Sequence, residues 1–221
     1  MKYASRWTIL ILFFVTALTV SVMPSVSQAN DKDDDGWIRL FDGKSLDGWK
    51  ASENAEQWKV KDGMIVAAGP RSHLFYVGDD PENPPKFKSF RFKADVMTTP
   101  GSNSGMYFHA KFQEGGWPRT GFEAQVNNSH TDPVRTGSIY HLVKNFDPPA
   151  KDNEWFTQEI VVDADKKTIK TIVDGKTISE YTEPKGKTGE LEVIDQGTFA
   201  LQAHDPKSTT YYKNIQVKPL D

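Results

Sequence analysis

The 221-residue chain contains no cysteine, which excludes disulfide bonds, cysteine-ligated metal centres and a cysteine nucleophile. It also lacks the G-x-S-x-G nucleophile elbow, the H-E-x-x-H zinc motif, the P-loop and the G-x-G-x-x-G dinucleotide turn. Its five histidines do not follow a metal-ligand spacing. Any catalytic chemistry therefore has to be assembled from side chains on separate segments of the chain.

An excess of basic charge is missing as well, since 27 Lys and Arg residues stand against 30 Asp and Glu residues. Residues 1–29 hold two of the basic residues and no acidic one, so the remaining chain has 27 − 2 = 25 basic residues against 30 acidic ones. A surface that binds the phosphates of nucleic acid needs positive charge. The composition therefore argues against nucleic acid as a partner.

Residues 1–29 have the pattern of a secretory signal peptide. Lys2 and Arg6 form a basic start, residues 7–22 are mainly apolar, and a small-x-small S-Q-A sequence ends at Ala29. A retained membrane anchor is the alternative, but hydroxyl side chains interrupt the apolar segment and a proline follows it. We expect cleavage after Ala29, export to a bacterial periplasm or exterior, and no stable membrane insertion afterwards.

The rest of the chain divides into an acidic tail at residues 30–36 and one folded domain at residues 37–221. The tail reads N-D-K-D-D-D-G, which lacks the spacing of a calcium-binding loop and indicates a disordered, solvated segment. No repeat of propeller or solenoid length and no linker divides the folded part.

The folded part has the pattern of strands and turns, because apolar and polar residues alternate and no ten-residue apolar stripe has helical spacing. About a dozen strands are expected, among them a hairpin around residues 61–63 and a strand at residues 138–144. This pattern predicts an all-β fold, namely a two-sheet antiparallel β-sandwich or jelly roll. Four tryptophans are expected to fill its core: Trp37, Trp49, Trp58 and Trp155.

Residues 103–126 combine two predicted strands with a Gly-Gly-Trp-Pro loop. Because strand side chains alternate between two faces, one face of this pair is apolar and the other is polar. The polar face carries Tyr107, His109, Lys111, Glu123 and Gln125. A solvated sheet face would need only polarity, whereas a phenol, an imidazole, an acid and an amide together suit a polar ligand. Both interpretations stay open from these residues alone.

Two further segments extend this polar face. Gln202 and His204 share one face of a predicted strand near the C-terminus, and Trp117 lies in the loop beside the polar face. If the strands join one sheet, an acid, two amides and an imidazole converge on one surface. For His204 alone, the alternative is an exposed or structurally bonded histidine, and for Asp205 it is a chain turn. Lesser candidates on or beside the central loops are Asp132, Arg135, Tyr140 and Lys144.

Several motifs resemble the 3-keto-disaccharide hydrolase domain family, long catalogued as a domain of unknown function. They are L-F-D-G-K-S-L-D-G-W at residues 40–49, N-S-G-M-Y-F at 103–108, G-F-E-A-Q-V at 121–126 and L-Q-A-H-D at 201–205. The resemblance runs from Trp37 to Leu220 and implies a concanavalin-A-like jelly roll that acts on 3-keto-glycosides. One departure is His109, where members of the family commonly have arginine.

The resemblance implies a 3-keto-glycoside substrate, and the pattern of residues 1–29 predicts export. The expected function is therefore an exported enzyme that removes the C2 proton of such a substrate, eliminates the group at C1 and adds water. Such a reaction needs a base poised near neutral pH and a donor to the enediolate oxygen, rather than the paired carboxylates of ordinary glycosidases. Glu123 and His204 are the expected catalytic pair, and the sequence leaves open which is the base. The expected substrate-binding residues are Asn103, Tyr107, His109, Trp117, Gln125, Lys144 and Gln202.

A carbohydrate is the expected partner. No cofactor and no metal ligand is assigned, and a divalent cation that shares in stabilising the enediolate stays open. The competing interpretation is a non-catalytic, lectin-like carbohydrate-binding domain in which Trp117 and Tyr107 serve as stacking platforms. The third interpretation is a structural module of an outer-surface assembly.

Overall fold

A computed structural model describes Met1, residues 33–189 and residues 191–220. Apart from Met1, the predicted signal peptide and the start of the acidic tail lie outside the described residues. In chain order the described elements are β1 (Ile38–Arg39), β2 (Trp49–Ala51), the short 3₁₀ helix η1 (Ala55–Gln57), β3 (Trp58–Lys61), β4 (Met64–Ala68), β5 (Ser72–Tyr76), β6 (Phe90–Thr98), β7 (Ser104–Ala110), β8 (Phe122–Val126), β9 (Phe156–Asp163), β10 (Thr168–Val173), β11 (Lys176–Thr182), β12 (Thr198–Ala203) and β13 (Thr209–Pro219).

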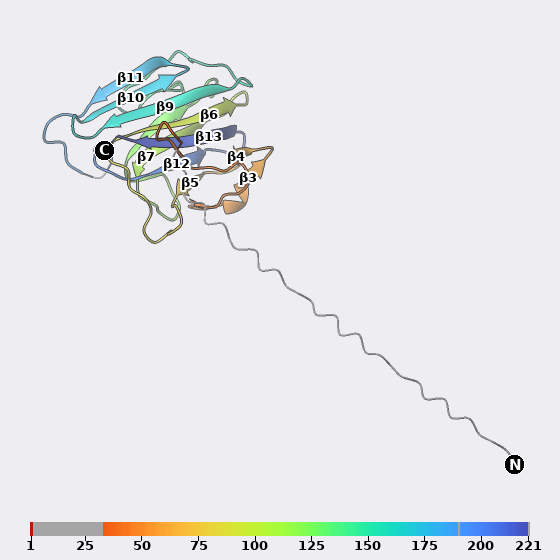
Figure 1. Cartoon of the computed structure of the whole chain (residues 1–221). Coiled ribbons are helices and arrows are strands. Elements are labelled where there is room, and N and C mark those ends of the chain that lie inside the picture. Colours follow the sequence, from red (N-terminus) through yellow and green to blue (C-terminus); the bar gives the residue numbers. More distant parts are fainter. Residues whose placement is uncertain (2–32, 190, 221) are drawn as a thin grey trace.

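These strands form two antiparallel sheets that pack face to face (Figure 1). The larger, eight-stranded sheet has the order β11-β10-β9-β6-β13-β4-β3, with β1 paired to β13. The smaller, five-stranded sheet has the order β2-β5-β12-β7-β8. The all-β, two-sheet jelly roll expected from the sequence is therefore confirmed.

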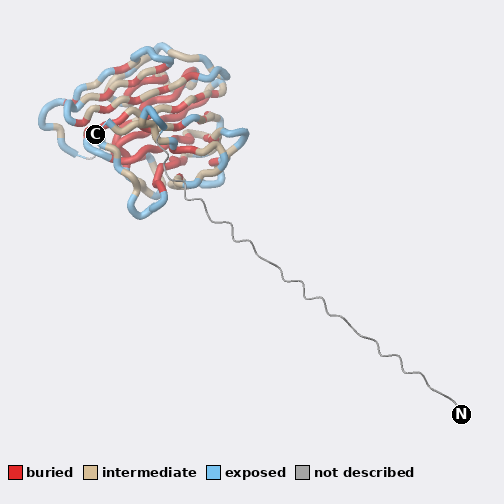
Figure 2. Tube along the Cα trace, in the orientation of Figure 1, coloured by how far each residue is buried: buried red, intermediate tan, exposed pale blue. Residues whose placement is uncertain are grey.

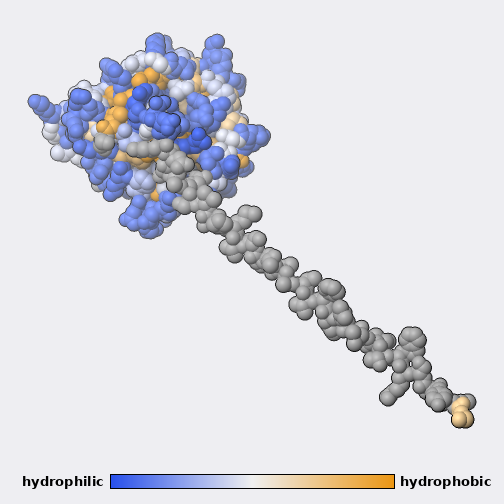
Figure 3. All heavy atoms as spheres, viewed as in Figure 1, coloured by the Kyte–Doolittle hydropathy of each residue, from blue (hydrophilic) through white to orange (hydrophobic). Residues whose placement is uncertain are grey.

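Alternation along the strands decides which side chains enter the space between the sheets. In β6, Phe90, Phe92, Ala94 and Val96 are fully buried, while the residues between them are partly exposed. The same alternation of buried and intermediate residues follows the long strands in Figure 2. The outer surface in Figure 3 is mainly hydrophilic, with only scattered hydrophobic patches. Burial of the apolar faces is the main force that holds the two sheets together.

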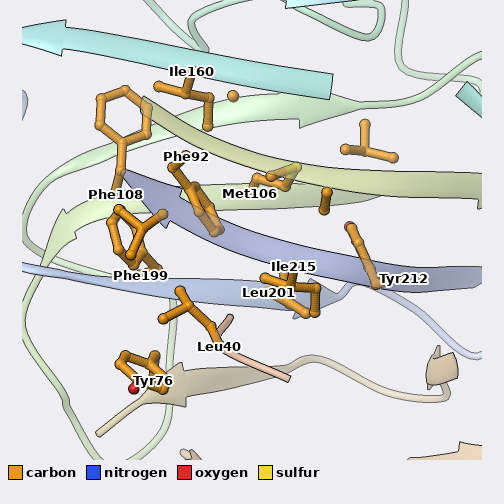
Figure 4. Close-up of a cluster of buried hydrophobic side chains, with 14 of the residues drawn as sticks. Leu40, Tyr76, Phe92, Met106, Phe108, Ile160, Phe199, Leu201, Tyr212 and Ile215 are labelled. Carbon is orange, nitrogen blue, oxygen red and sulfur yellow. The ribbon is translucent and has the colours of Figure 1, made fainter. Parts of the chain in front are cut away.

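Aromatic rings from both sheets meet in the core (Figure 4). Phe92 of β6 stacks on Phe199 of β12, with ring centroids 4.1 Å apart and an interplanar angle of 18°. Phe108 of β7 stacks on Phe122 of β8 at 5.2 Å. Such ring pairs add roughly 0.5–1.5 kcal/mol each to the stabilisation that comes from area burial.

The hairpin predicted around residues 61–63 joins β3 to β4. Asp62 has a φ of 50° and Gly63 a φ of 77°, and Lys61 pairs with Met64 across the turn. Positive φ at both central residues is the requirement of the tight turn that matches the twist of two antiparallel strands.

Two expectations about local structure are wrong. Residues 138–144 form a turn rather than a strand, because Ile139 pairs with Val143 of the same segment and His141 has a φ of 67°. Among the four tryptophans, Trp49 and Trp58 lie in the core. Trp155 is 37% exposed, and Trp37 is partly exposed. Lysine ammonium groups cover both of these rings, each 3.9 Å from the ring centroid.

None of the described segments is a helix of the length and apolarity needed to cross a bilayer.

Candidate active site

A cavity of about 380 Å³ opens on the outer face of the five-stranded sheet, opposite the core. Strands β7, β8 and β12 supply its floor, and the loop at residues 111–121 and the turn around Tyr140 supply part of its walls. The lining residues used below are Asn103, Tyr107, Trp117, Glu123, Gln125, Tyr140, Gln202 and His204. These three strands present polar side chains on one face because their apolar neighbours point into the core.

A hydrogen-bonded triad forms the centre of this floor. Tyr107 and Glu123 are directly opposite each other in the β7–β8 register. The Tyr107 hydroxyl donates to Glu123 Oε2 at 2.7 Å, and Gln202 Nε2 donates to the Tyr107 hydroxyl at 3.0 Å and to Glu123 Oε1 at 3.3 Å. The sequence alternation had placed these three side chains on one face, and the register brings them into contact.

Burial raises the pKa of Glu123 to about 7, and the negative charge of Asp132 adds to the effect. Hydrogen bonds from Tyr107 and Gln202 act in the opposite direction, but they do not outweigh the loss of hydration. Burial and the adjacent Glu123 carboxylate also raise the pKa of Tyr107 well above its usual value. Near neutral pH the site therefore contains a carboxyl group that can take up or release a proton beside a phenol that stays protonated.

Carboxamides continue the floor beyond the triad. Gln125 Nε2 donates to Asn103 Oδ1 at 3.1 Å, and both side chains are buried. Among the described residues, the buried Oε1 atoms of Gln125 and Gln202 have no hydrogen-bond partner in the protein. Buried acceptors of this kind usually have a partner, and a ligand hydroxyl would supply one.

His204 follows β12 directly and lies in the wall of the cavity. Its Nδ1 is 3.0 Å from Asp205 Oδ2, and its ring centroid is 5.3 Å from that of Trp117. Burial alone would raise the pKa of Asp205, but hydrogen bonds from Ser208, His204 and the Lys207 amide lower it to about 2. Asp205 is therefore an anion throughout the physiological range.

Trp117 is 46% exposed and forms the outer wall of the cavity. Its loop is anchored by Gln113, whose Nε2 donates to the Gly115 and Trp117 carbonyls at 2.8 and 2.9 Å. The Gly116 amide also donates to Glu53 Oε1 at 3.0 Å. An exposed ring on an anchored loop is suited to stack on the apolar face of a sugar.

Two of the expected substrate-binding residues lie away from the cavity. His109 is on the strand predicted for it, but β7 contains a bulge: Ala110 pairs with Thr198, whereas Tyr107 pairs with Ala200, so β7 has one extra residue. With a φ of 52°, His109 turns away from the polar face, and its Nε2 hydrogen-bonds the Lys88 carbonyl at 2.9 Å. Burial lowers the pKa of His109, so it is a neutral structural histidine.

Lys144 is the second of these residues. It is exposed and is not among the residues that line the cavity. The physical reason is the turn at residues 138–144, which replaces the expected strand and its alternation.

The same turn brings Tyr140 into the site, a residue that had only a minor place among the candidates. Its amide donates to the Glu123 carbonyl at 2.9 Å, and its hydroxyl donates to Asp132 Oδ2 at 3.2 Å. The rim pair of His141 and Glu192, 3.0 Å apart, was not anticipated. No local sequence pattern predicts that Tyr140, His141 and Glu192 belong to the site, because their contacts join loops that are distant in sequence.

Among the described residues, one group could supply ligands to a divalent cation: His130, His204 and Asp205, whose ligand atoms lie within 4.8 Å of one another. The candidate ligand atoms of these three residues already make polar contacts within the protein. His130 Nδ1 accepts the Asp132 amide at 3.0 Å, so the proton of a neutral His130 ring resides on Nε2, which faces Asp205 at 3.7 Å. In this arrangement Nε2 is a donor, and a metal ion would have to displace its proton.

Residues 36–218 match the family model described as the 3-keto-alpha-glucoside-1,2-lyase-like domain. The chain belongs to this family. A 3-keto-disaccharide hydrolase of Bacteroides thetaiotaomicron is 32% identical over 84 residues, which is 36% of this chain and 29% of that relative. The aligned segment thus spans less than a third of the relative's length.

Solved structures share the fold. A Parabacteroides distasonis protein, provisionally described as a glycosyl hydrolase, has a TM-score of 0.67 at 23% identity, covering 85% of this chain and 95% of that one. The carbohydrate-binding module CBM66 of Bacillus subtilis has a TM-score of 0.55 at 12% identity, covering 78% of this chain and 96% of the module. At these identities the likeness concerns the jelly roll alone.

Proposed function

We propose that the protein cleaves glycosides whose sugar carries a ketone at C3, with Glu123 as the base. One observation carries the proposal: the Glu123 carboxyl has a pKa of about 7 in a sugar-sized cavity and touches the protonated phenol of Tyr107. Membership of the lyase-like family and the similarity to a 3-keto-disaccharide hydrolase support the substrate class.

The reaction begins at C2 of the sugar, where the neighbouring ketone makes the hydrogen acidic. Glu123 takes this proton, and the electron pair of the C2–H bond moves toward the C3 oxygen to give an enediolate. The enediolate then expels the aglycone oxygen from C1, which leaves a double bond between C1 and C2. Addition of water at C1 and return of the proton to C2 complete a net hydrolysis. A base of suitable pKa contributes about 10²–10⁴-fold to such a step.

Tyr107 is the donor to the developing enediolate oxygen. Its high pKa keeps the hydroxyl protonated, and once Glu123 has taken the C2 proton the carboxylate no longer holds this hydroxyl as tightly. A well-aimed donor of this kind is worth on the order of 3–4 kcal/mol in the transition state.

His204 transfers protons at C1, where the bond to the aglycone oxygen breaks. As an imidazolium supported by Asp205, it donates a proton to the departing aglycone oxygen. As the resulting neutral base it accepts a proton from the incoming water. Gln125, Gln202 and Asn103 bind sugar hydroxyls through their carboxamides, and Trp117 stacks on the ring.

The test is aglycone release from a chromogenic 3-keto-glucoside by the purified protein, followed with and without a chelator. Glu123→Gln keeps the shape of the side chain but removes the base, so kcat should fall at least about a hundredfold. The matched control is Glu180→Gln, an exposed carboxylate on β11 of the other sheet, which should leave the rate unchanged. An unchanged rate in Glu123→Gln would eliminate Glu123 as the base.

A second candidate function is carbohydrate binding without catalysis. The shared fold of the CBM66 module and the exposed ring of Trp117 favour it. In that case glycans would bind with Trp117-dependent affinity, but no aglycone would be released at any pH.

We further propose that the protein is exported to the periplasm or the exterior of a bacterium through residues 1–29. The supporting observation is the basic, apolar and small-x-small pattern of that segment. N-terminal sequencing of protein recovered from the periplasmic fraction should begin at Asn30.

A further inference from the structure

We propose that Asp205 is a positioning residue, which fixes the His204 ring so that Nε2 faces the sugar cavity as the proton-transferring atom. The catalytic part of this inference rests on the proposed function, because it concerns how His204 serves that reaction. The conformational part, which nitrogen of His204 carries the proton, stands on the geometry alone.

The first step is the contact between the two side chains. His204 Nδ1 is 3.0 Å from Asp205 Oδ2, and an ionised carboxylate can only accept a hydrogen bond. Nδ1 must therefore carry a proton. In the neutral ring this leaves the lone pair on Nε2, and in the imidazolium it leaves a second N–H there. The rings of Trp117 and His130 pack against His204 with centroids 5.3 and 5.5 Å away.

The second step is that Asp205 is itself held in place. Ser208 Oγ donates to Asp205 Oδ2 at 2.6 Å, and the Lys207 amide donates to Oδ1 at 2.8 Å. Ser208 Oγ also accepts the Asn103 amide at 2.8 Å, which ties the carboxylate to the floor of the cavity. A carboxylate with three donors stays ionised and keeps one orientation.

The third step concerns His130, on the other side of Asp205. Because its Nδ1 accepts the Asp132 amide, its Nε2–H faces the same Asp205 oxygen at 3.7 Å. Asp205 thus lies between two imidazoles: His130 Nε2 faces its Oδ2 at 3.7 Å, whereas His204 Nε2 takes part in no described polar contact. If His130, His204 and Asp205 instead held a divalent ion, addition of that ion would change the NMR signals of both histidine rings.

A purely structural role for Asp205 has to be separated from this proposal. The Ser208 amide donates to the Asp205 carbonyl at 3.0 Å and the Lys207 amide to its side chain, so Asp205 also shapes the turn between β12 and β13. Asp205→Asn preserves that turn, since its Oδ1 can still accept the Lys207 amide. The Nδ2 amide of the new asparagine then replaces the oxygen that faces His204 and donates a hydrogen bond to His204 Nδ1. The single ring proton of neutral His204 therefore moves to Nε2.

The experiment combines ¹⁵N NMR of the histidine rings with steady-state kinetics on a 3-keto-glucoside. His204→Gln identifies the His204 signals, and Asp165→Asn, an exposed aspartate paired with Lys88, is the matched control. In the wild type, neutral His204 should carry its proton on Nδ1, and in Asp205→Asn it should carry it on Nε2. The variant should lose at least about a hundredfold in kcat with KM within about threefold, and its melting temperature should match that of the control.

Three results would overturn the proposal. One is an Nε2-protonated neutral His204 in the wild type. Another is an Asp205→Asn protein in which the His204 tautomer and the pH–rate profile are unaltered. That result would show that Asp205 only shapes the turn between β12 and β13. The third is stoichiometric Mn²⁺ or Zn²⁺ that perturbs His130 and His204 together in the wild type only, which would make Asp205 a metal ligand. If the tautomer changes as expected but the wild type releases no aglycone, the proposed function fails and the positioning of His204 stands.

Discussion

The carboxylate of Glu123 lies over Gly105, in the space where any other residue would carry its Cβ. A Cβ built on Gly105 would lie 2.9 Å from both Cγ and Cδ of Glu123, closer than real Cβ contacts occur. Gly105 belongs to β7 and Glu123 to β8, so this gap lets the carboxylate reach across β7 toward Gln202 of β12. The glycine of the N-S-G motif is thus required by space rather than by a positive φ.

Gly105→Ala should therefore push the Glu123 carboxylate out of its hydrogen bonds with Tyr107 and Gln202. We expect a cost of about 1–3 kcal/mol in the free energy of unfolding, measured in urea, because overpacking of this size has that effect. The control is a double-mutant cycle with Glu123→Ala, which removes the obstructing atoms. An equal cost in both backgrounds would show that Gly105 and Glu123 do not interact.

Tyr107→Phe should move the acidic limb of the pH–rate profile to higher pH. The rate rises with pH as Glu123 ionises, with a midpoint near its pKa of about 7. The Tyr107 hydrogen bond lowers that pKa, so its loss lets burial raise the pKa further. Loss of the enediolate donor should also reduce the plateau rate by about 10²–10³-fold. A profile that moves to lower pH would contradict this assignment of the acidic limb.

Trp117→Ala should weaken substrate binding more than it slows the chemistry. Loss of one stacking platform is expected to raise KM by roughly three- to tenfold with a smaller change in kcat. Trp155→Phe is the matched control, because Trp155 is also partly exposed but packs against Lys213 on the other sheet. Ligand binding should quench tryptophan fluorescence in the control protein and much less in Trp117→Ala.

His73 should make the fold sensitive to acid. It is fully buried on β5, neither ring nitrogen has a hydrogen-bond partner among the described residues, and burial lowers its pKa to about 3. The unfolded chain binds a proton at this histidine below a pH of about 6.5, whereas the folded protein does not, so stability falls as the pH decreases from 6.5 toward 3.

Unfolding free energies at pH 7 and pH 4 would measure this loss, which should be on the order of 3 kcal/mol for His73. His73→Leu should remove that part of the pH dependence. Glu123 contributes with the opposite sign, because its folded pKa is raised and its contribution favours the folded state as the pH falls toward 4.5. The comparison of wild type with His73→Leu cancels this contribution. An identical loss in both proteins would exclude His73 as its source.

Most of the fold could be predicted from the alternation of apolar and polar residues, because a strand that covers a core must alternate. The same rule placed Tyr107, Glu123, Gln125 and Gln202 on one face, and these residues line the cavity. It failed at His109, where a bulge adds one residue to β7 and turns the side chain to the Lys88 carbonyl. It failed again at residues 138–144, where a turn brings Tyr140 beside Glu123 and leaves Lys144 exposed.

The sequence by itself determined the sheet-forming pattern, the hairpin at Asp62 and Gly63, and the polar inventory of the site, since these depend on neighbouring residues. Only the tertiary structure decided that Glu123 crosses Gly105 to meet Gln202, that its pKa rises to about 7, and that Asp205 orients His204. Strand order, bulges and burial arise from contacts between segments far apart in the chain. Desolvation, the cause of the Glu123 pKa, exists only once those segments have closed around it.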